Sequence, residues 1–434
     1  MFLNFFFLIL ILLLIGSAPT IDEQSLFPLS IEMTMIASAV IYTTTITLIY
    51  LQSRFWRRPF GFQKDRLTTL INIELIIMLI VLYFGVGMQR LFFIPLFFPF
   101  SLTALTITSL SLYSLGIAVG HYSYQRHWNP FHPVRPSVIF LIPFTIPFLI
   151  FVFINDASEA VSFAPLLNFL GVSENETAQI ALAALGGLAC ICLIIILLPP
   201  LIIKLWSCQP LKDPALVARL ESLCQRAHFT HAGFKVWSIM DGVLTAAILG
   251  VLGPLRYVIF TSDLLQRLSP EAIEAILAHE IGHSRHKHLL IYPFILAGVG
   301  ITWTLFLLLS GEVLIKLPEF AILILFAINA WLYFRFVFGY FSRLFERQAD
   351  LMVFELGLPS ENLIEAFSSL GGSSESSRRA PNWHHFSIQE RIDFLQSAQN
   401  DPKKILLHQR KVCYSLIFYF VISMVALFVI KGFI

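Results

Sequence analysis

The chain has 434 residues, of which 57% are hydrophobic and 13% are charged, and its formal net charge is +2. An ordinary soluble domain is about 45–50% apolar and about 25% charged, so a soluble globular enzyme is excluded as a description of the whole chain. The five cysteines form no CxxC pair, which argues against a disulfide scaffold and a thiolate metal site. No run of Lys and Arg interleaved with aromatic residues indicates a nucleic-acid partner. The composition predicts a membrane protein that crosses the bilayer several times.

Nine stretches are apolar and long enough to cross a bilayer as helices, which takes about 20 residues. In chain order they cover 2–18, 31–51, 67–88, 91–119, 137–154, 178–203, 289–310, 319–341 and 413–432. The first stretch could instead be a signal peptide. However, no Lys or Arg precedes it, and Pro19 makes Ser17-Ala18 a poor cleavage site. We therefore expect it to be a membrane span.

Basic residues are unevenly distributed among the connecting segments. Four segments contain Lys or Arg: 52–66, 120–136, 204–288 and 342–412. Two others contain acidic residues but no basic ones: 19–30 and 155–177. Basic segments face the cytoplasm by the positive-inside rule, and one alternation satisfies every segment. This predicts a cytoplasmic N-terminus and brings the two long basic segments together on the cytoplasmic side, joined by a two-span hairpin over 289–341.

The sequence His279-Glu280-Ile281-Gly282-His283 contains the pattern H-E-x-x-H. Ser269 and Pro270 are a suitable N-cap and first residue for a helix that runs into the pattern. On a helix, residues four apart lie on one face, so both imidazoles could bind one zinc ion about 2.0–2.1 Å away. Glu280 lies between them and could reach a water molecule at the ion.

A catalytic zinc site needs a third protein ligand and an open position. The metzincin pattern requires Gly at 286 and His at 289, where this sequence has His286 and Leu289. The site-two protease pattern requires Asp-Gly after the motif, but Asp241-Gly242 precedes it. The remaining candidate is a distant carboxylate. Glu346, with Asp350 four residues later, comes directly after the predicted span 319–341.

Together, His279-Glu280-x-x-His283, Glu346-x-x-Ala349-Asp350 and the two spans between them resemble the integral-membrane zinc metalloproteases of the CAAX prenyl endopeptidase and HtpX heat-shock protease family. The segment 246–265 resembles the family's substrate-binding edge strand. The segment 385–392 resembles its His-Pro-x-x-x-Glu-Arg-Ile sequence. The resemblance covers roughly 215–395.

Two positions depart from the family pattern. Thr245 stands where the family often has Asn. This difference leaves open how the substrate strand would be anchored. Phe386 replaces the usual Pro, so His384 competes with His385 for the role of that histidine.

The resemblance implies one zinc ion per chain, held by His279, His283 and Glu346. Zinc lowers the pKa of water toward about 7, and Glu280 would take the proton as that water attacks a peptide carbonyl.

Further roles are implied for residues around the metal. His385 would donate to the developing oxyanion, with Arg391 nearby. Asp350 would orient a ligand histidine or donate a proton. Protein or peptide substrate would bind as an extended strand beside 246–250. His286 and His288 are expected to face water or lipid headgroups.

The predicted fold is a polytopic α-helical membrane protein of about nine spans with a small, mainly helical α+β zincin-type protease domain. Its predicted parts are an N-terminal membrane region (1–203), the protease domain with its hairpin (204–412) and a C-terminal membrane helix (413–434). The predicted function is hydrolysis of peptide bonds at the cytoplasmic face of a bacterial inner membrane or endoplasmic reticulum. Two alternatives stay open: site-specific CAAX-type processing of lipidated proteins, and a non-catalytic zinc-binding scaffold.

Overall fold

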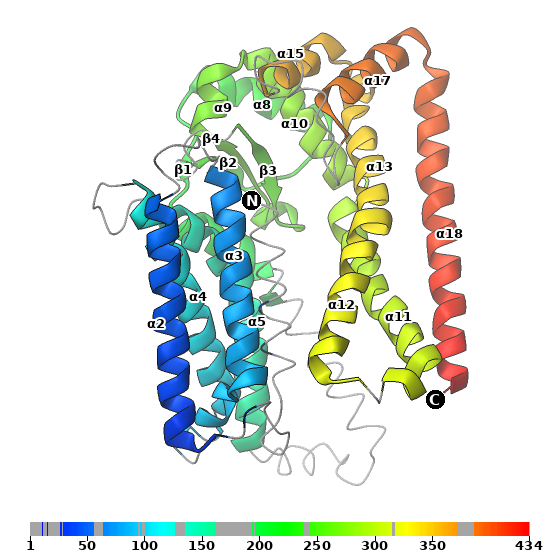
Figure 1. Ribbon diagram of the computed structural model, residues 1–434. Coiled ribbons are helices and arrows are strands. Elements are labelled where there is room, and N and C mark those ends of the chain that lie inside the picture. The colour runs from blue at the N-terminus through cyan, green and yellow to red at the C-terminus, as the bar shows by residue number, and fades with distance from the viewer. Residues whose placement is uncertain are drawn as a thin grey trace, which may run out of the picture. The chain divides into compact units, whose positions relative to one another are not determined.

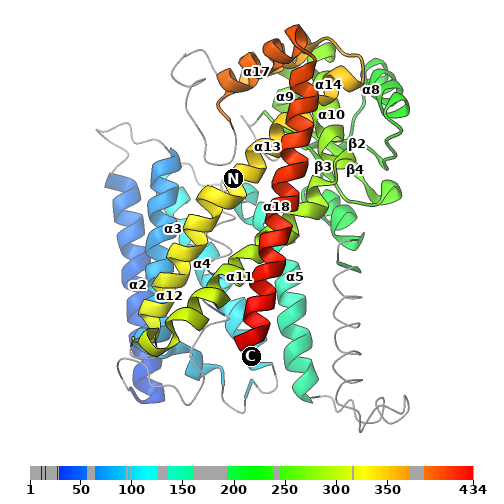
Figure 2. The same cartoon turned by 90° about the vertical axis from the view of Figure 1, so that its right-hand side faces the viewer.

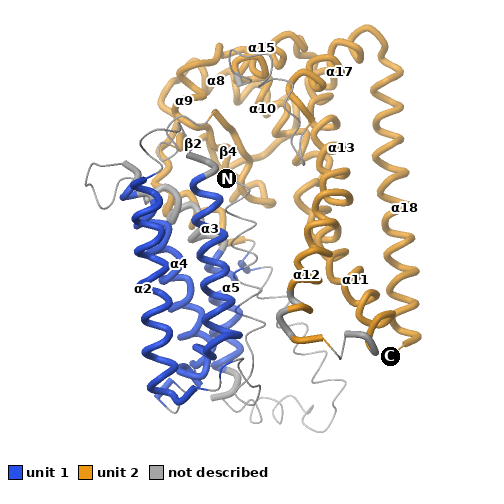
Figure 3. The backbone as a smooth tube through the Cα atoms, viewed as in Figure 1, with its two compact units in different colours: residues 1–194 blue, residues 195–434 orange. Residues whose placement is uncertain are grey.

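The computed structural model describes residues 11, 15, 27, 29–55, 64–93, 96–97, 100–125, 135–160, 193–194, 196–237, 244–314, 317–370 and 386–433. The chain separates into two compact units, residues 1–194 and residues 195–434 (Figure 3). Each unit has its own set of long apolar helices.

The first unit is a bundle of helices. Its helices are α2 (Ile31–Phe55), α3 (Lys64–Ile80), α4 (Ser101–Gln125) and α5 (Arg135–Ala160), with a π-helical turn η1 (Val81–Gly85) and a 3-10 turn η2 (Met88–Leu91) after α3. Helix α4 packs against α2, α3 and α5. The helix in the predicted span 91–119 begins later than expected, at Ser101, and the sequence before it has prolines at 95 and 99, a residue type that disfavours helix interiors.

A four-stranded sheet lies in the part of the second unit outside its long apolar helices, which we call the soluble part (Figure 1). Its strands are β1 (Gln209–Pro210), β2 (Gly233–Trp237), β3 (Ala246–Leu249) and β4 (Tyr257–Thr261), in the order β1-β2-β4-β3. Strand β4 is parallel to β2 and antiparallel to β3. Within the described residues, β3 is therefore an edge strand, as the resemblance predicted for this segment.

Short helices complete the soluble part. They are α8 (Pro214–Arg226), α9 (Ser262–Arg267), α10 (Pro270–Arg285), α14 (Met352–Glu355), α15 (Ser360–Leu370) and α17 (Ile388–Asn400). Their apolar faces share one core with the sheet, which includes Leu220, Phe260, Ile273, Met352 and Leu395. Burial of this surface holds helices from both long basic segments together.

Helix α10 carries the H-E-x-x-H sequence and begins where the sequence predicted. The Ser269 hydroxyl accepts a hydrogen bond from the Ala272 N–H at 3.1 Å, and Pro270 is the first helical residue. Most of the helix is buried, so α10 is the central helix of the soluble part rather than a surface element.

Three long helical segments of the second unit are apolar enough to cross a membrane (Figure 2). They are α11 (His288–Leu314), the continuous helix formed by α12 (Glu319–Tyr333), a π-helical turn η4 (Phe334–Phe338) and α13 (Gly339–Asp350), and α18 (Lys403–Phe433). Helix α11 packs against α12 and α18. Because α12 continues into α13, the predicted eighth span runs without a break into the soluble part.

The described residues contain six helices long and apolar enough to span a bilayer, Ile31–Phe55, Leu67–Gly85, Ser101–Gly120, His288–Gly311, Ile324–Glu355 and Lys403–Phe433. Each coincides with one of the nine predicted spans. The predicted spans 2–18 and 178–203 lie largely outside the described residues, and 137–154 falls in α5, whose apolar stretch Thr145–Ala157 is shorter. The polytopic helical fold with a small sheet is confirmed, whereas the count of nine spans is not.

Candidate metal centre

Two histidines of α10 and one carboxylate of α13 meet in the second unit. The Nε2 atoms of His279 and His283 lie 3.2 Å apart. Glu346 Oε2 lies 3.8 Å from His279 Nε2, and Glu346 Oε1 lies 3.5 Å from His283 Nε2. Among the described residues, these three form the one group of histidine, cysteine and acidic side chains arranged to hold a metal ion. The structure thus brings together the three ligands that the sequence predicted.

Close packing of α10 on α13 makes this meeting possible. A Cβ atom on Gly282 would lie 2.8 Å from the Cα and 3.0 Å from the carbonyl oxygen of Ala349. Such contacts are too short for ordinary side-chain packing, so the two helices can approach this closely only with glycine at this position. Gly282 therefore sets the distance across which Glu346 reaches the histidines.

A buried ion pair supports His279 from behind. Asp350 is fully buried, and its Oδ1 lies 2.9 Å from His279 Nδ1. Arg391 of α17 donates to both oxygens of the same carboxylate, from Nε at 3.0 Å and from Nη2 at 2.6 Å. Its Nη1 also lies 3.4 Å from Glu346 Oε2. This bidentate arrangement fixes the orientation of Asp350 and keeps its charge compensated.

Glu280 stands beside the histidine pair and opens into a cavity of about 380 Å³. The same cavity is lined by His283 and, on the side of the sheet, by Ile248 and Gly250 at the end of β3. Burial raises the pKa of the Glu280 carboxyl above its ordinary value, while the neighbouring His279 and His283 act in the opposite direction. A carboxylate with a raised pKa is suited to accept a proton near neutral pH.

The structure places six of the seven predicted site residues in one cluster: His279, Glu280, His283, Glu346, Asp350 and Arg391. His385, and its rival His384, lie outside the described residues. Arg391 faces Asp350 and Glu346 in this cluster.

One expectation about the neighbouring histidines is wrong. His288 does not face water or headgroups: it is 1% exposed, and its Nδ1 lies 2.9 Å from Nδ1 of His283. The sequence offered no spacing signal for this contact, because residues five apart on one helix do not share a face. A continuous helix would have carried it to another face, but α10 ends at Arg285 and the chain turns.

The donor set fits a zinc ion. A tetrahedral ion with bonds of about 2.0–2.1 Å separates its ligand atoms by roughly 3.3 Å, close to the observed 3.2, 3.5 and 3.8 Å. Two imidazoles and one carboxylate are a ligand set of catalytic zinc sites, in which a fourth position stays free. The cavity beside Glu280 adjoins this group.

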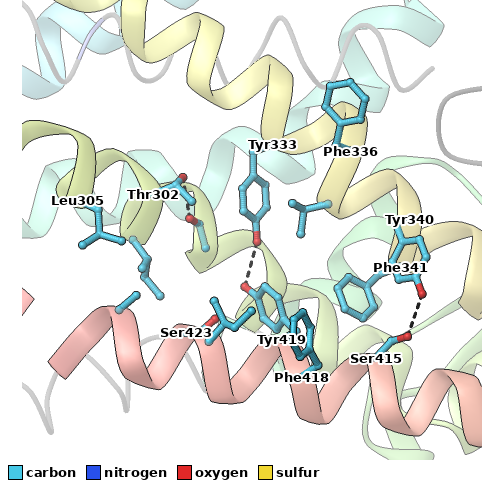
Figure 4. A pocket seen from close by; sticks show the side chains of 15 residues that line it. Thr302, Leu305, Tyr333, Phe336, Tyr340, Phe341, Ser415, Phe418, Tyr419 and Ser423 are labelled. Carbon is cyan, nitrogen blue, oxygen red and sulfur yellow. Dashed lines mark hydrogen bonds between the residues drawn. The ribbon is translucent and has the colours of Figure 1, made fainter. Parts of the chain in front are cut away.

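A second cavity, of about 520 Å³, lies among α11, the α12–α13 helix and α18 (Figure 4). Its lining is mostly apolar, with hydrogen-bonded hydroxyl pairs between Tyr333 and Tyr419 and between Tyr340 and Ser415, both 2.9 Å apart. None of the predicted site residues lines it, so it is separate from the group formed by His279, His283 and Glu346.

Parts of the chain are similar to known proteins. Residues 210–399 match the family model described as Peptidase family M48. A Protease HtpX homolog of Thermoplasma acidophilum is 30% identical over 165 residues, which cover 35% of this chain and 51% of the relative. The chain thus matches about half the length of that relative. A crystal structure of S. mikatae Ste24p aligns over 86% of this chain and 99% of its own, with 18% identity and a TM-score of 0.43. The similarity to peptidase family M48 therefore covers region 210–399 of the chain.

Proposed function

We propose that the protein is an integral-membrane zinc metalloendopeptidase. The observation that carries this proposal is the assembly of His279, His283 and Glu346 within 4.8 Å, with Glu280 lining a cavity that Ile248 of β3, an edge strand among the described residues, also lines. M48 peptidases are zinc metalloproteases in general, and the described donor set is compatible with one zinc ion per chain.

In this proposal the chain's own residues divide the chemistry. When bound, zinc would polarise the peptide carbonyl and activate water for attack. Glu280 accepts the proton of the attacking water and returns it to the leaving amine. Asp350 and Arg391 keep the His279 imidazole oriented, with Nδ1 toward Asp350 and Nε2 toward the metal. His385 remains the proposed donor to the oxyanion, with Arg391 in the same region of the chain.

Protein substrates would add to the sheet as an extended strand. Among the residues that the structure describes, β3 pairs with β4 alone, and its residue Ile248 lines the cavity that Glu280 also lines. An unpaired edge offers backbone donors and acceptors to a substrate whatever its side chains are, which favours a broad endopeptidase. Thr245, the departure from the family pattern, is itself anchored: its N–H donates to Thr261 Oγ1 at 3.1 Å.

The proposed location follows from charge and topology. The segments that build the soluble part are the two long basic ones, so we place the protease domain on the cytoplasmic side of the membrane. In this proposal we keep the predicted domain boundaries after residues 203 and 412.

The test is a comparison of Glu280→Gln with wild type. The variant should keep its zinc but lose cleavage of a generic unfolded protein by a factor on the order of 100 or more, because the amide cannot accept the proton. Glu271→Gln, on the same helix but outside the cavity, is the matched control and should cleave normally. Equal cleavage by wild type and Glu280→Gln would contradict the proposal.

A non-catalytic scaffold is the second candidate, and zinc content with no cleavage by wild type would favour it. Site-specific processing of lipidated proteins would appear as cleavage of prenylated peptides without cleavage of unfolded proteins.

A further inference from the structure

The hydrogen-bonding side chains behind His283 form a chain that runs from α10 to α18. His283 Nδ1 lies 2.9 Å from His288 Nδ1, and His288 Nε2 lies 2.9 Å from Gln348 Oε1. Gln348 Nε2 then donates to Gln409 Oε1 on α18. His288 and Gln348 are 1% and 7% exposed, so water has little access to this chain. It connects a proposed metal ligand with three different helices.

The directions of these hydrogen bonds determine the tautomer of His283. Because Gln348 uses its amide N–H toward Gln409, it presents its carbonyl oxygen to His288. His288 must then donate from Nε2, and a neutral imidazole that does so has a lone pair on Nδ1. His283 therefore donates from Nδ1, which leaves the lone pair of its Nε2 directed at His279 Nε2 and Glu346. This is the tautomer that a zinc ligand needs.

The two predicted ligand histidines are thus oriented by different groups. His279 has a buried carboxylate, Asp350, behind its Nδ1. His283 has a neutral imidazole in the same place. A carboxylate behind both rings would bring a further negative charge into a buried site that already holds Glu280, Glu346 and Asp350, whereas an imidazole orients the ring without adding charge.

Packing and backbone geometry hold His288 in place. Its ring stacks on Phe345 with centroids 4.2 Å apart and an interplanar angle of 8°. Lys287, just before it, has a left-handed backbone conformation with φ of 57°, which a non-glycine residue rarely adopts. The chain turns at this residue between α10 and α11, and the turn places Nδ1 of His288 beside Nδ1 of His283. Strain at this point is consistent with a functional requirement for the contact.

We propose that His288, backed by Gln348 and Gln409, is a positioning residue that fixes the tautomer and orientation of His283 for zinc binding. The proposal rests on the proposed function, because it assigns His283 as a metal ligand. His288 acts by accepting the hydrogen bond from His283 Nδ1, and Gln348 acts by accepting the hydrogen bond from His288 Nε2.

The test measures zinc affinity of the full-length, detergent-purified chain by competition with a chromophoric chelator. His288→Phe keeps the stacking on Phe345 but removes the acceptor, and it should weaken zinc binding by about 10–100-fold. His288→Asn places an amide oxygen where Nδ1 lies and should restore most of the affinity. Gln348→Leu, which cannot accept the hydrogen bond from His288 Nε2, should also weaken zinc binding.

His408→Phe is the matched control. His408 is also buried, and it lies against α13 with its Nε2 3.0 Å from the Leu344 carbonyl oxygen, but no described hydrogen bond joins it to His283. It should lower thermal stability without changing zinc affinity. The visible spectrum of the cobalt-substituted protein gives an independent measurement, since it should change in His288→Phe and return in His288→Asn.

Two results would overturn this assignment: wild-type zinc affinity in His288→Phe, or equal losses in His288→Phe and His288→Asn, which would indicate a packing role only. The outcome is separable from that of the proposed function. If the wild type binds zinc but cleaves nothing, the proposed protease function is refuted, while the zinc affinities of the variants still test the role of His288. A wild type without zinc affinity refutes both.

Discussion

Gly282 shows how much of the metal-binding group depends on one residue without a side chain. It lies between His279 and His283 in sequence, and a Cβ atom at this position would meet the Ala349 backbone. The H-E-x-x-H pattern allows any residue type at position 282. In this fold it is not free, because α13 brings Glu346 to the histidines only by packing against this glycine.

Gly282→Ala should therefore destabilise the protein by about 1–3 kcal/mol, the usual effect of forcing an extra carbon into a packed interior, and it should lower zinc content. Thermal unfolding and metal analysis of the purified variant measure both effects. Gly300→Ala on α11 is the control: nothing lies within 4 Å of its Cβ position, and alanine is the better helix former. Equal stability of the two variants would show that the α10–α13 contact is not limiting.

Arg391 illustrates the electrostatic requirement of the same site. Its side chain is 12% exposed and pairs with the fully buried Asp350. Arg391→Met would leave that carboxylate without its partner, so we expect a loss of about 3–5 kcal/mol in the free energy of unfolding, measured by denaturant titration. Arg267→Met, at an exposed position on α9, should change stability little. A loss as small in Arg391→Met as in this control would mean that water or another group compensates Asp350.

At the scale of elements, the parts of the site that local sequence determines were predictable. Ser269, Pro270 and the apolar residues that follow them specify α10, and Glu346 with Asp350 at i+4 specifies one face of α13. The approach of the two helices was predictable only from the hairpin between them. The turn at Lys287 was not predictable, because nothing about a lysine indicates the left-handed backbone conformation that this residue adopts. The contact of His288 with His283 was missed for that reason.

Helix α8 is joined to the start of α10 by Arg219, which donates to Glu271 at 2.5 Å and to Glu274 at 2.6 Å. The pKa of Glu271 is lowered, first by a backbone hydrogen bond and then by Arg219. A lowered carboxyl pKa contributes stability above the ordinary glutamate value of about 4.3, and this stability is lost as pH falls through the folded-state value. Arg219→Gln should lower Tm at pH 7 by a few degrees, about 2–4 °C.

The difference in Tm between wild type and Arg219→Gln should shrink as pH falls below the ordinary glutamate value of about 4.3 and through the lowered folded-state pKa of Glu271. Calorimetry at several pH values measures this, with Arg267→Gln as a control that lies outside the pairing. A difference that grows toward acid pH would contradict the pairing.

Strand β3 allows a sharper test of substrate binding. Thr261 N–H donates to the Thr245 carbonyl at 3.0 Å, so in the alternating antiparallel ladder Ala247 is the next residue bonded to β4, and the Ile248 N–H faces the free edge. Ile248→Pro should remove one donor to the substrate and raise KM on the order of tenfold, with zinc content unchanged. Ala247→Pro should instead break the β3–β4 ladder and lower stability. An unchanged KM in Ile248→Pro would exclude strand addition at this edge.

At the scale of the whole molecule, hydrophobicity predicted the described spans well, because a bilayer requires long uninterrupted apolar helices. The exceptions have physical causes. The span expected from 91 begins at Ser101, after prolines, and the eighth span continues into the soluble part as α13. The apolar pattern of the sequence does not show how far this helix extends. It continues past the apolar stretch into α13, which packs against other helices of the protein.

Membrane orientation is a prediction for intact cells. A cysteine introduced at Arg267, in a chain otherwise free of cysteine, should react with a membrane-impermeant maleimide only after permeabilisation. A cysteine at position 22, in a segment without basic residues, should react before it. The reverse pattern would place the protease domain on the other side of the membrane.

The central claim is that His279, His283 and Glu346 hold a zinc ion that cleavage requires. The most direct measurement is the zinc content of the purified full-length protein and of Glu346→Ala, with cleavage of an unfolded protein followed in both. We predict about one zinc per chain in wild type, and joint loss of zinc and cleavage in the variant. A variant that kept both its zinc and its activity would contradict the assignment of Glu346 and, with it, the proposed metal centre.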